Sequence, residues 1–255
     1  MTRDGFAPTI ADLALCRSGL YEALALGFRP PTVETLARLA SPEAAAALGD
    51  VAAVLDDAWG STLAEGVWGL GSPTTLAALV AAFHRLFGHT ARGAVPPYET
   101  EYGTDSLFQP MHEMSDLGAF YRAFGLAVHP GAHERPDHVS CECEFLAFLC
   151  RKEAYARDRD DRAMLEATRQ GVRRFLRDHL GRWGPGFGRA LARHDPVGFF
   201  GGLGALAAEY LSRECARVGV TPGPELLRLR SASVPAAPAA CGDPAEDPWS
   251  ETGVL

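Results

Sequence analysis

The sequence predicts an all-α protein, and three observations carry this prediction. Apolar residues recur at helical spacing along most of the 255 residues. Ser-Pro and Asp-Pro pairs repeatedly place an N-cap residue before a proline at the first helical position. No segment alternates apolar and polar residues as a β-strand does. We therefore expect one globular domain over residues 1–230, built from about nine or ten helices.

The first half of the chain predicts four helices. Residues 10–28, 32–39 and 42–55 carry the helical spacing, and the pair Pro30-Pro31 separates the first two segments. Glycines at positions 60, 66, 69 and 71 predict a loop. Ser72-Pro73 then starts a helix that ends at Gly88. Its apolar stripe comprises Leu76, Leu79, Val80, Phe83, Leu86 and Phe87.

Two further helices are predicted in the centre of the chain. Ser115 is a suitable N-cap for a short aromatic helix, and Gly125 stands where its C-terminus favours positive φ. Asp137 is predicted to be the N-cap of a second helix, which is apolar on nearly every face. Glu142 shares a face with several of its apolar residues. Burying an unpaired carboxylate is costly, so we expect Glu142 to have a specific partner.

The last part of the chain predicts helices over residues 162–180, around 187–192, and from Asp195-Pro196 towards Gly219. Gly181, Gly184 and Pro185 are interpreted as helix breakers before the second of these. From residue 231 the composition changes to proline, alanine and acidic residues. Residues 231–255 are therefore predicted to be a disordered tail.

Charge, hydropathy and cysteine content indicate the class of partner and the cellular compartment. The chain has 32 acidic and 24 basic residues, which favours basic peptides over nucleic acid as a partner. No secretory signal and no apolar run of about 18 residues is present, so no membrane span is expected. The six cysteines lack a framework spacing. We interpret them as reduced thiols of a cytoplasmic protein.

Specific residues also suggest two alternative functions, metal binding and enzyme catalysis. His129, His133 and His138 lie within ten residues and could serve a metal-dependent helical enzyme. Their spacing fits no common structural-zinc pattern, so we predict no metal and no cofactor. Asp137 and His138 could exchange protons, although a helix start explains both residues. The chain has no nucleophile elbow, phosphate loop or dinucleotide motif, and we predict no enzyme activity.

Three short motifs resemble a known family when their order and spacing are considered together. They are Phe83-His84-Arg85-Leu86-Phe87, Pro97-Tyr98-Glu99, and Glu134-Arg135-Pro136-Asp137-His138. They are similar to the motifs of the TorD/DmsD/NarJ chaperones for molybdenum enzymes. The branch that serves type II DMSO-reductase-family enzymes is the most similar. The resemblance covers residues 10–220.

This resemblance implies a helical chaperone without catalytic activity. Its client would be the apo catalytic subunit of a molybdenum oxidoreductase, bound through its twin-arginine leader or amino-terminal segment until the molybdopterin cofactor is inserted. A structural helical subunit of an oxidoreductase complex is the other alternative. The client's identity and the choice between monomer and homodimer stay open.

The predicted peptide site combines aromatic, proline and acidic residues, which suit an apolar segment flanked by basic residues. The peptide-binding residues are predicted to be Phe83, Leu86, Phe87, Tyr98, Glu99, Tyr102, Tyr121, Asp137 and His138. Glu134, Pro136, Glu142 and Glu144 are predicted to support them.

Overall fold

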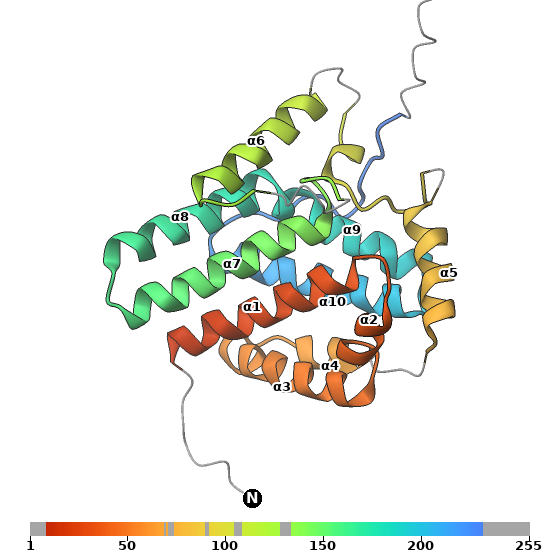
Figure 1. Ribbon diagram of the computed structural model, residues 1–255, viewed down its shortest axis with the longest axis horizontal. Helices are drawn as coiled ribbons and strands as arrows, with labels where there is room; N and C mark the ends of the chain where they lie inside the picture. Colours follow the sequence, from red (N-terminus) through yellow and green to blue (C-terminus); the bar gives the residue numbers. More distant parts are fainter. Residues whose placement is uncertain are drawn as a thin grey trace, which may run out of the picture.

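The computed structural model describes residues 9–68, 70, 74–89, 92–104, 109–127 and 134–231. Over these residues it contains ten α-helices and no β-strand, which confirms the all-α prediction (Figure 1). The predicted tail from residue 232 onward lies outside the described residues. None of the described helices is long and apolar enough to cross a bilayer.

Five helices form the amino-terminal part: α1 (Ile10–Gly27), α2 (Val33–Arg38), α3 (Pro42–Trp59), α4 (Leu63–Trp68) and α5 (Leu76–Phe87). The loop predicted over residues 60–71 is wrong, because α4 lies within it. The Asp56 carboxylate accepts hydrogen bonds from the amides of Leu63 (2.8 Å) and Ala64 (2.9 Å). The cap of α4 thus comes from the preceding helix, where a local search for an N-cap does not find it.

The remaining elements are the 3₁₀ turn η2 (Glu99–Glu101), α6 (Gln109–Ala123), α7 (Val139–Asp158), α8 (Arg162–Asp178), α9 (Leu180–His194) and α10 (Phe199–Arg217). Gly125 has a φ of 74°, as expected after a helix. The N-cap prediction for Ser115 is wrong, since α6 begins at Gln109. Likewise, Gly198 rather than Asp195 caps α10.

The short helix predicted around residues 187–192 is part of the longer α9, which includes the presumed breakers. Pro185 has no amide hydrogen, and this leaves the carbonyl of Gly181 free. That carbonyl instead accepts a hydrogen bond from the amide of Gly223 at 2.9 Å. The glycines of α9 permit close packing: a Cβ on Gly188 would lie 2.3 Å from the carbonyl oxygen of Gly204 in α10. These residues therefore serve tertiary packing rather than helix termination.

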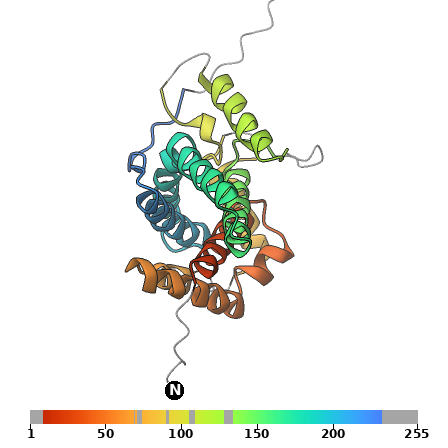
Figure 2. The same cartoon turned by 90° about the vertical axis from the view of Figure 1, so that its left-hand side faces the viewer.

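The core lies where α1 and α7 run alongside each other and α9 and α10 pack behind them (Figure 1). Figure 2 shows α6 at one end of this assembly and α3 with α4 at the other. Phenylalanine rings join the layers: Phe187 of α9 contacts Phe28 after α1 at 5.3 Å between centroids, and Phe87 of α5 contacts Phe200 of α10 at the same distance. The α7 helix packs against α1, α8 and α9, and the loop with the ERPDH motif directly precedes it.

The close contact between α9 and α10 makes a testable prediction. The Gly188→Ala substitution should lower the free energy of unfolding by about 2 kcal/mol, because the new methyl group must displace the backbone of α10. The matched control is Gly19→Ala in α1, whose added Cβ would be 3.7 Å from its nearest neighbour, Val51. Urea unfolding should show the control unchanged or more stable. Equal midpoints for Gly188→Ala and wild type would contradict the close contact.

Candidate functional site

The two loop motifs found in the sequence, Pro97-Tyr98-Glu99 and ERPDH (residues 134–138), lie side by side at the start of α7. The amide of Glu99 donates to the carbonyl of Asp137, and the amide of Val139 donates to the carbonyl of Pro97, each at 2.9 Å. These bonds form a short antiparallel bridge between the loops. The sequence resemblance therefore corresponds to one structural unit rather than to separate surface loops.

Asp137 joins the two loops through its side chain. Its carboxylate is fully buried and accepts hydrogen bonds from the hydroxyl of Thr100 (2.7 Å) and from Nε and Nη2 of Arg135 (3.0 and 2.7 Å). The prediction that Asp137 caps α7 is wrong. His138 is the N-cap, and its Nδ1 accepts from the amide of Ser140 at 3.1 Å.

His138 is buried and uncharged at neutral pH. Burial lowers the pKa of His138 to about 3, and the nearby positive charges of Arg29 and Arg135 act in the same direction. A general acid or base works best when its pKa is near the operating pH. This geometry contradicts the proton-exchange alternative for Asp137 and His138, because one residue bridges loops and the other caps a helix.

Glu99 starts a second polar network beneath the first loop. Its carboxylate is buried, and its two oxygens lie 2.6 Å from Nη2 of Arg182 and 3.0 Å from Nδ1 of His179. Arg182 also bonds Glu113 of α6 (2.9 Å), and Arg230 bonds Glu113 as well (3.1 Å). The network therefore ties η2, α6, α9 and the last described residues together.

Glu142 has the specific partner that the sequence led us to expect. Its side chain is fully buried, and Nε1 of Trp183 donates to its Oε1 at 3.2 Å. Burial, together with the negative charges of Glu99 and Asp137, raises the pKa of Glu142 well above its usual value. This shift favours the protonated form of the Glu142 carboxyl group in the folded protein. The ring of Tyr102 stacks on the ring of Trp183, with 5.5 Å between the centroids.

Most of the predicted peptide-binding residues are buried. Phe83, Leu86 and Phe87 lie in the core, as do Glu99, Tyr102, Tyr121, Asp137 and His138. Tyr98 is half-buried, and its ring lies 4.6 Å from the guanidinium carbon of Arg135. Tyr121 donates from its hydroxyl to the carbonyl of Pro136 at 2.8 Å. These contacts hold the loops in place, and direct contact with a peptide stays a prediction.

A cavity of about 620 Å³ opens beside this unit, between the end of α1, the end of α6 and one face of α7. Its apolar lining includes Tyr121, Leu126, Phe145 and Phe148. Three of the predicted residues line it: Tyr121, Glu134 and Glu144. The sequence analysis did not assign Leu126, Phe145 or Phe148 to the site. The available signal was the spacing of Phe145 and Phe148, which lie three residues apart on one helix face.

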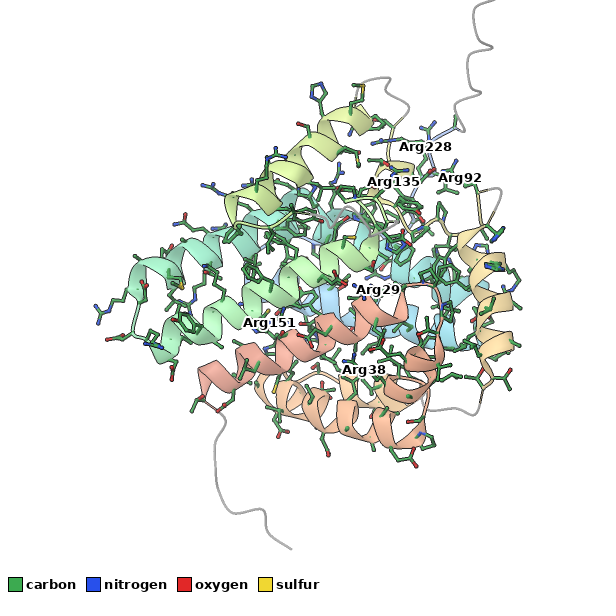
Figure 3. The ribbon with its side chains drawn as sticks, in the orientation of Figure 1. Arg29, Arg38, Arg92, Arg135, Arg151 and Arg228 are labelled. Atoms are coloured by element: carbon green, nitrogen blue, oxygen red, sulfur yellow. The ribbon has the colours of Figure 1, made fainter. Side chains whose placement is uncertain are left out.

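Charged residues also line this cavity, among them Arg29, Glu144 and Arg151, whereas Glu22 does not. Arg29 forms an ion pair with Glu144, and Arg151 forms one with Glu22. Figure 3 shows Arg29 and Arg151 along the boundary between the neighbouring helices α1 and α7. All four side chains are roughly half exposed, so each ion pair contributes little to stability and can be exchanged. The cavity thus combines an apolar lining with accessible carboxylates.

The metal alternative depends on residues that are only partly described. His129 and His133 lie outside the described residues, whereas His138 caps α7. No group of three or more potential metal ligands occurs among the residues with described positions. The absence of a metal therefore stays a prediction.

Comparison with known proteins gives one family and several curated relatives. The family model described as "Nitrate reductase delta subunit" matches residues 41–189, which include α3 to most of α9. The selenate reductase assembly chaperone protein of Thauera selenatis is 33% identical over 130 residues, covering 51% of this chain and 62% of the relative. The chlorate reductase assembly chaperone protein of Ideonella dechloratans is 32% identical over 122 residues, covering 48% and 58%.

The chaperone protein TorD of Vibrio cholerae is 27% identical over 138 residues, covering 53% of this chain and 60% of the relative. The matches thus span about 60% of the length of these relatives. The matched family region includes both loop motifs and the α6 and α7 walls of the cavity.

Proposed function

This chain belongs to the nitrate reductase delta subunit family, and from that premise we propose that it is an assembly chaperone for a molybdenum oxidoreductase. The observation that carries this proposal is that three relatives, from different organisms, are all named chaperones. The proposed client is the apo catalytic subunit of a DMSO-reductase-family enzyme. The chain would hold this client in the cytoplasm until its molybdopterin cofactor has been inserted, and would not itself catalyse a reaction.

We propose that the cavity beside α7 receives the client's twin-arginine leader. An apolar segment of the leader would occupy the space lined by Leu126, Phe145 and Phe148. The leader's arginines would pair with Glu144 and Glu22, which the chain's own Arg29 and Arg151 occupy in the structure described here. Exposed ion pairs are exchangeable because each is worth less than about 1 kcal/mol.

The residues predicted from the sequence then have two roles in this proposal. Tyr98, Tyr121 and Glu134 would contact the leader near the opening, because Tyr121 and Glu134 line the cavity and Tyr98 is close to Glu134 (3.5 Å). The buried members would keep the two loops and the start of α7 in position. Among these, Asp137 and Glu99 make the contacts that cross between elements.

A calorimetric titration with the leader peptide tests this site. Glu144→Gln should weaken leader binding about threefold at low salt, because one exposed ion pair is lost. The unpaired Arg29 would also repel the leader's arginines. The difference should shrink at high salt, since screening acts over about 8–10 Å at physiological ionic strength. The matched control is Glu43→Gln on α3, an exposed glutamate that does not line the cavity.

A second leader, with glutamine in place of both arginines, makes this test specific. Glu144→Gln should have no effect on the binding of this second leader, because the leader no longer has the arginines with which Glu144 would pair. If Glu144→Gln and Glu43→Gln bind the normal leader equally well at low salt, the cavity is not the leader site.

A further inference from the structure

A second cavity, of about 480 Å³, lies where α1, α7, α8 and the end of α10 meet, with Trp59 of α3 at its edge. It shares no lining residue with the cavity at Glu144. Five arginines line it: Arg17, Arg157, Arg169, Arg173 and Arg217. Only two carboxylates, those of Glu153 and Glu166, are among its lining residues. The lining of this cavity is therefore positively charged, although the net charge of the whole chain is −8.

The carboxylates near this cavity do not balance its arginines. Glu153 is shared by three of them: Arg17 lies 2.6 Å away, and Arg157 and Arg169 lie 3.4 Å away. Arg217 takes both oxygens of Glu214, at 2.6 and 3.0 Å. Arg173 forms no hydrogen bond or ion pair with any residue whose position is described. Positive charge therefore remains available in the cavity.

Two donors at this cavity are buried and lack hydrogen bonds. Within the described part of the chain, neither Nη1 of Arg17 nor Nε of Arg157 has a hydrogen-bond partner. The side chain of Arg17 is only 4% exposed, and its Nη1 is 3.9 Å from the nearest oxygen of Glu214. A buried donor without an acceptor costs about 1–3 kcal/mol. Because both nitrogens are closed to solvent, an anion in the cavity would interact with the charge of these two arginines rather than with these atoms.

We propose that this cavity binds the phosphate groups of a small soluble phosphorylated molecule. Guanidinium groups match the geometry of phosphate oxygens and remain charged at every physiological pH. A volume of about 480 Å³ is that of a small-molecule site. Leu13, Trp59 and Val218 form an apolar wall beside the arginines, where the remainder of such a molecule would lie. The inference does not depend on the proposed chaperone function, because the two cavities are separate.

Neighbouring arginines on α8 provide a matched test with pyrophosphate as the probe. Both are exposed, but only Arg173 lines the cavity. Neither side chain forms a hydrogen bond or an ion pair with a residue whose position is described. In calorimetric titrations at constant ionic strength, Arg173→Gln should weaken pyrophosphate binding about tenfold, equivalent to one charge-assisted hydrogen bond. Arg174→Gln should bind as the wild type does.

The double variant Arg169→Gln/Arg173→Gln should abolish detectable binding, with circular dichroism as the folding control. Failure of the wild type to bind millimolar pyrophosphate would overturn the proposal. Equal effects of Arg173→Gln and Arg174→Gln would also overturn it, because binding would then follow overall charge. Sedimentation of the wild type, but not of Arg173→Gln, with phosphatidic acid vesicles would overturn the assignment to a soluble molecule.

Discussion

Replacing Asp137 with alanine should lower the free energy of unfolding by about 3 kcal/mol. The Asp137 carboxylate is fully buried and accepts hydrogen bonds from Thr100 and Arg135. Its removal would leave the buried hydroxyl of Thr100 without this acceptor and would weaken the link between the two loops. The loss should exceed the roughly 1 kcal/mol that an N-cap contributes. The size of the effect therefore distinguishes a cross-link between loops from a helix cap.

Asp161 is the matched control for this prediction, because it is a true N-cap. Its Oδ1 accepts from the amide of Met164 at 2.9 Å at the start of α8. Urea unfolding of Asp137→Ala and Asp161→Ala should show a difference of about 2 kcal/mol between the two variants. If both substitutions lower the free energy of unfolding by a similar amount, Asp137 contributes no more to stability than a helix cap does.

The second large effect concerns the raised pKa of the buried Glu142 carboxyl group. Its pKa is raised in the folded protein, whereas in the unfolded chain it returns to about 4.5. Between these two values the folded state binds a proton that the unfolded state has released. Stability is then highest below pH 4.5 and falls by up to about 1.4 kcal/mol per pH unit as the pH rises towards the folded pKa.

Glu142→Gln keeps the shape of the protonated side chain and removes its titration. The variant should therefore gain stability relative to the wild type as the pH rises from 4.5 to 8, and the gain should diminish towards pH 4.5. Urea unfolding from pH 4.5 to 8 measures this directly. Glu65→Gln, on the exposed surface of α4, is the control. A pH-independent difference between Glu142→Gln and wild type would mean that folding does not raise the pKa of Glu142.

Local sequence signals were sufficient for most of the helices but not for all of their ends. Helical spacing predicted the limits of α1 and α8 to within two residues, and those of α3 to within four. The extent of α9 could not be predicted, since its glycines allow contact with α10 and Pro185 is accommodated by Gly223. Both compensations come from segments that are distant in sequence.

Several residues of the candidate site could likewise be predicted from the sequence, but their partners from distant segments could not. The need for a partner at Glu142 followed from its position on an apolar helix face, but Trp183 as that partner did not. Asp137 was recognised as important, yet its role was mistaken, because a helix cap and a link between loops have the same local sequence. The ion pair between Arg29 and Glu144 joins segments far apart in the chain and leaves no local signal.

Selective capture of the apo client tests the central claim most directly. The chain, carrying an affinity tag, would be isolated from cells that make the candidate molybdenum oxidoreductase, with and without synthesis of the molybdopterin cofactor. We expect the client to be captured when the cofactor is lacking, and to be released once it contains the cofactor. Equal capture of the mature, cofactor-loaded enzyme would contradict the account and would instead indicate a permanent structural subunit.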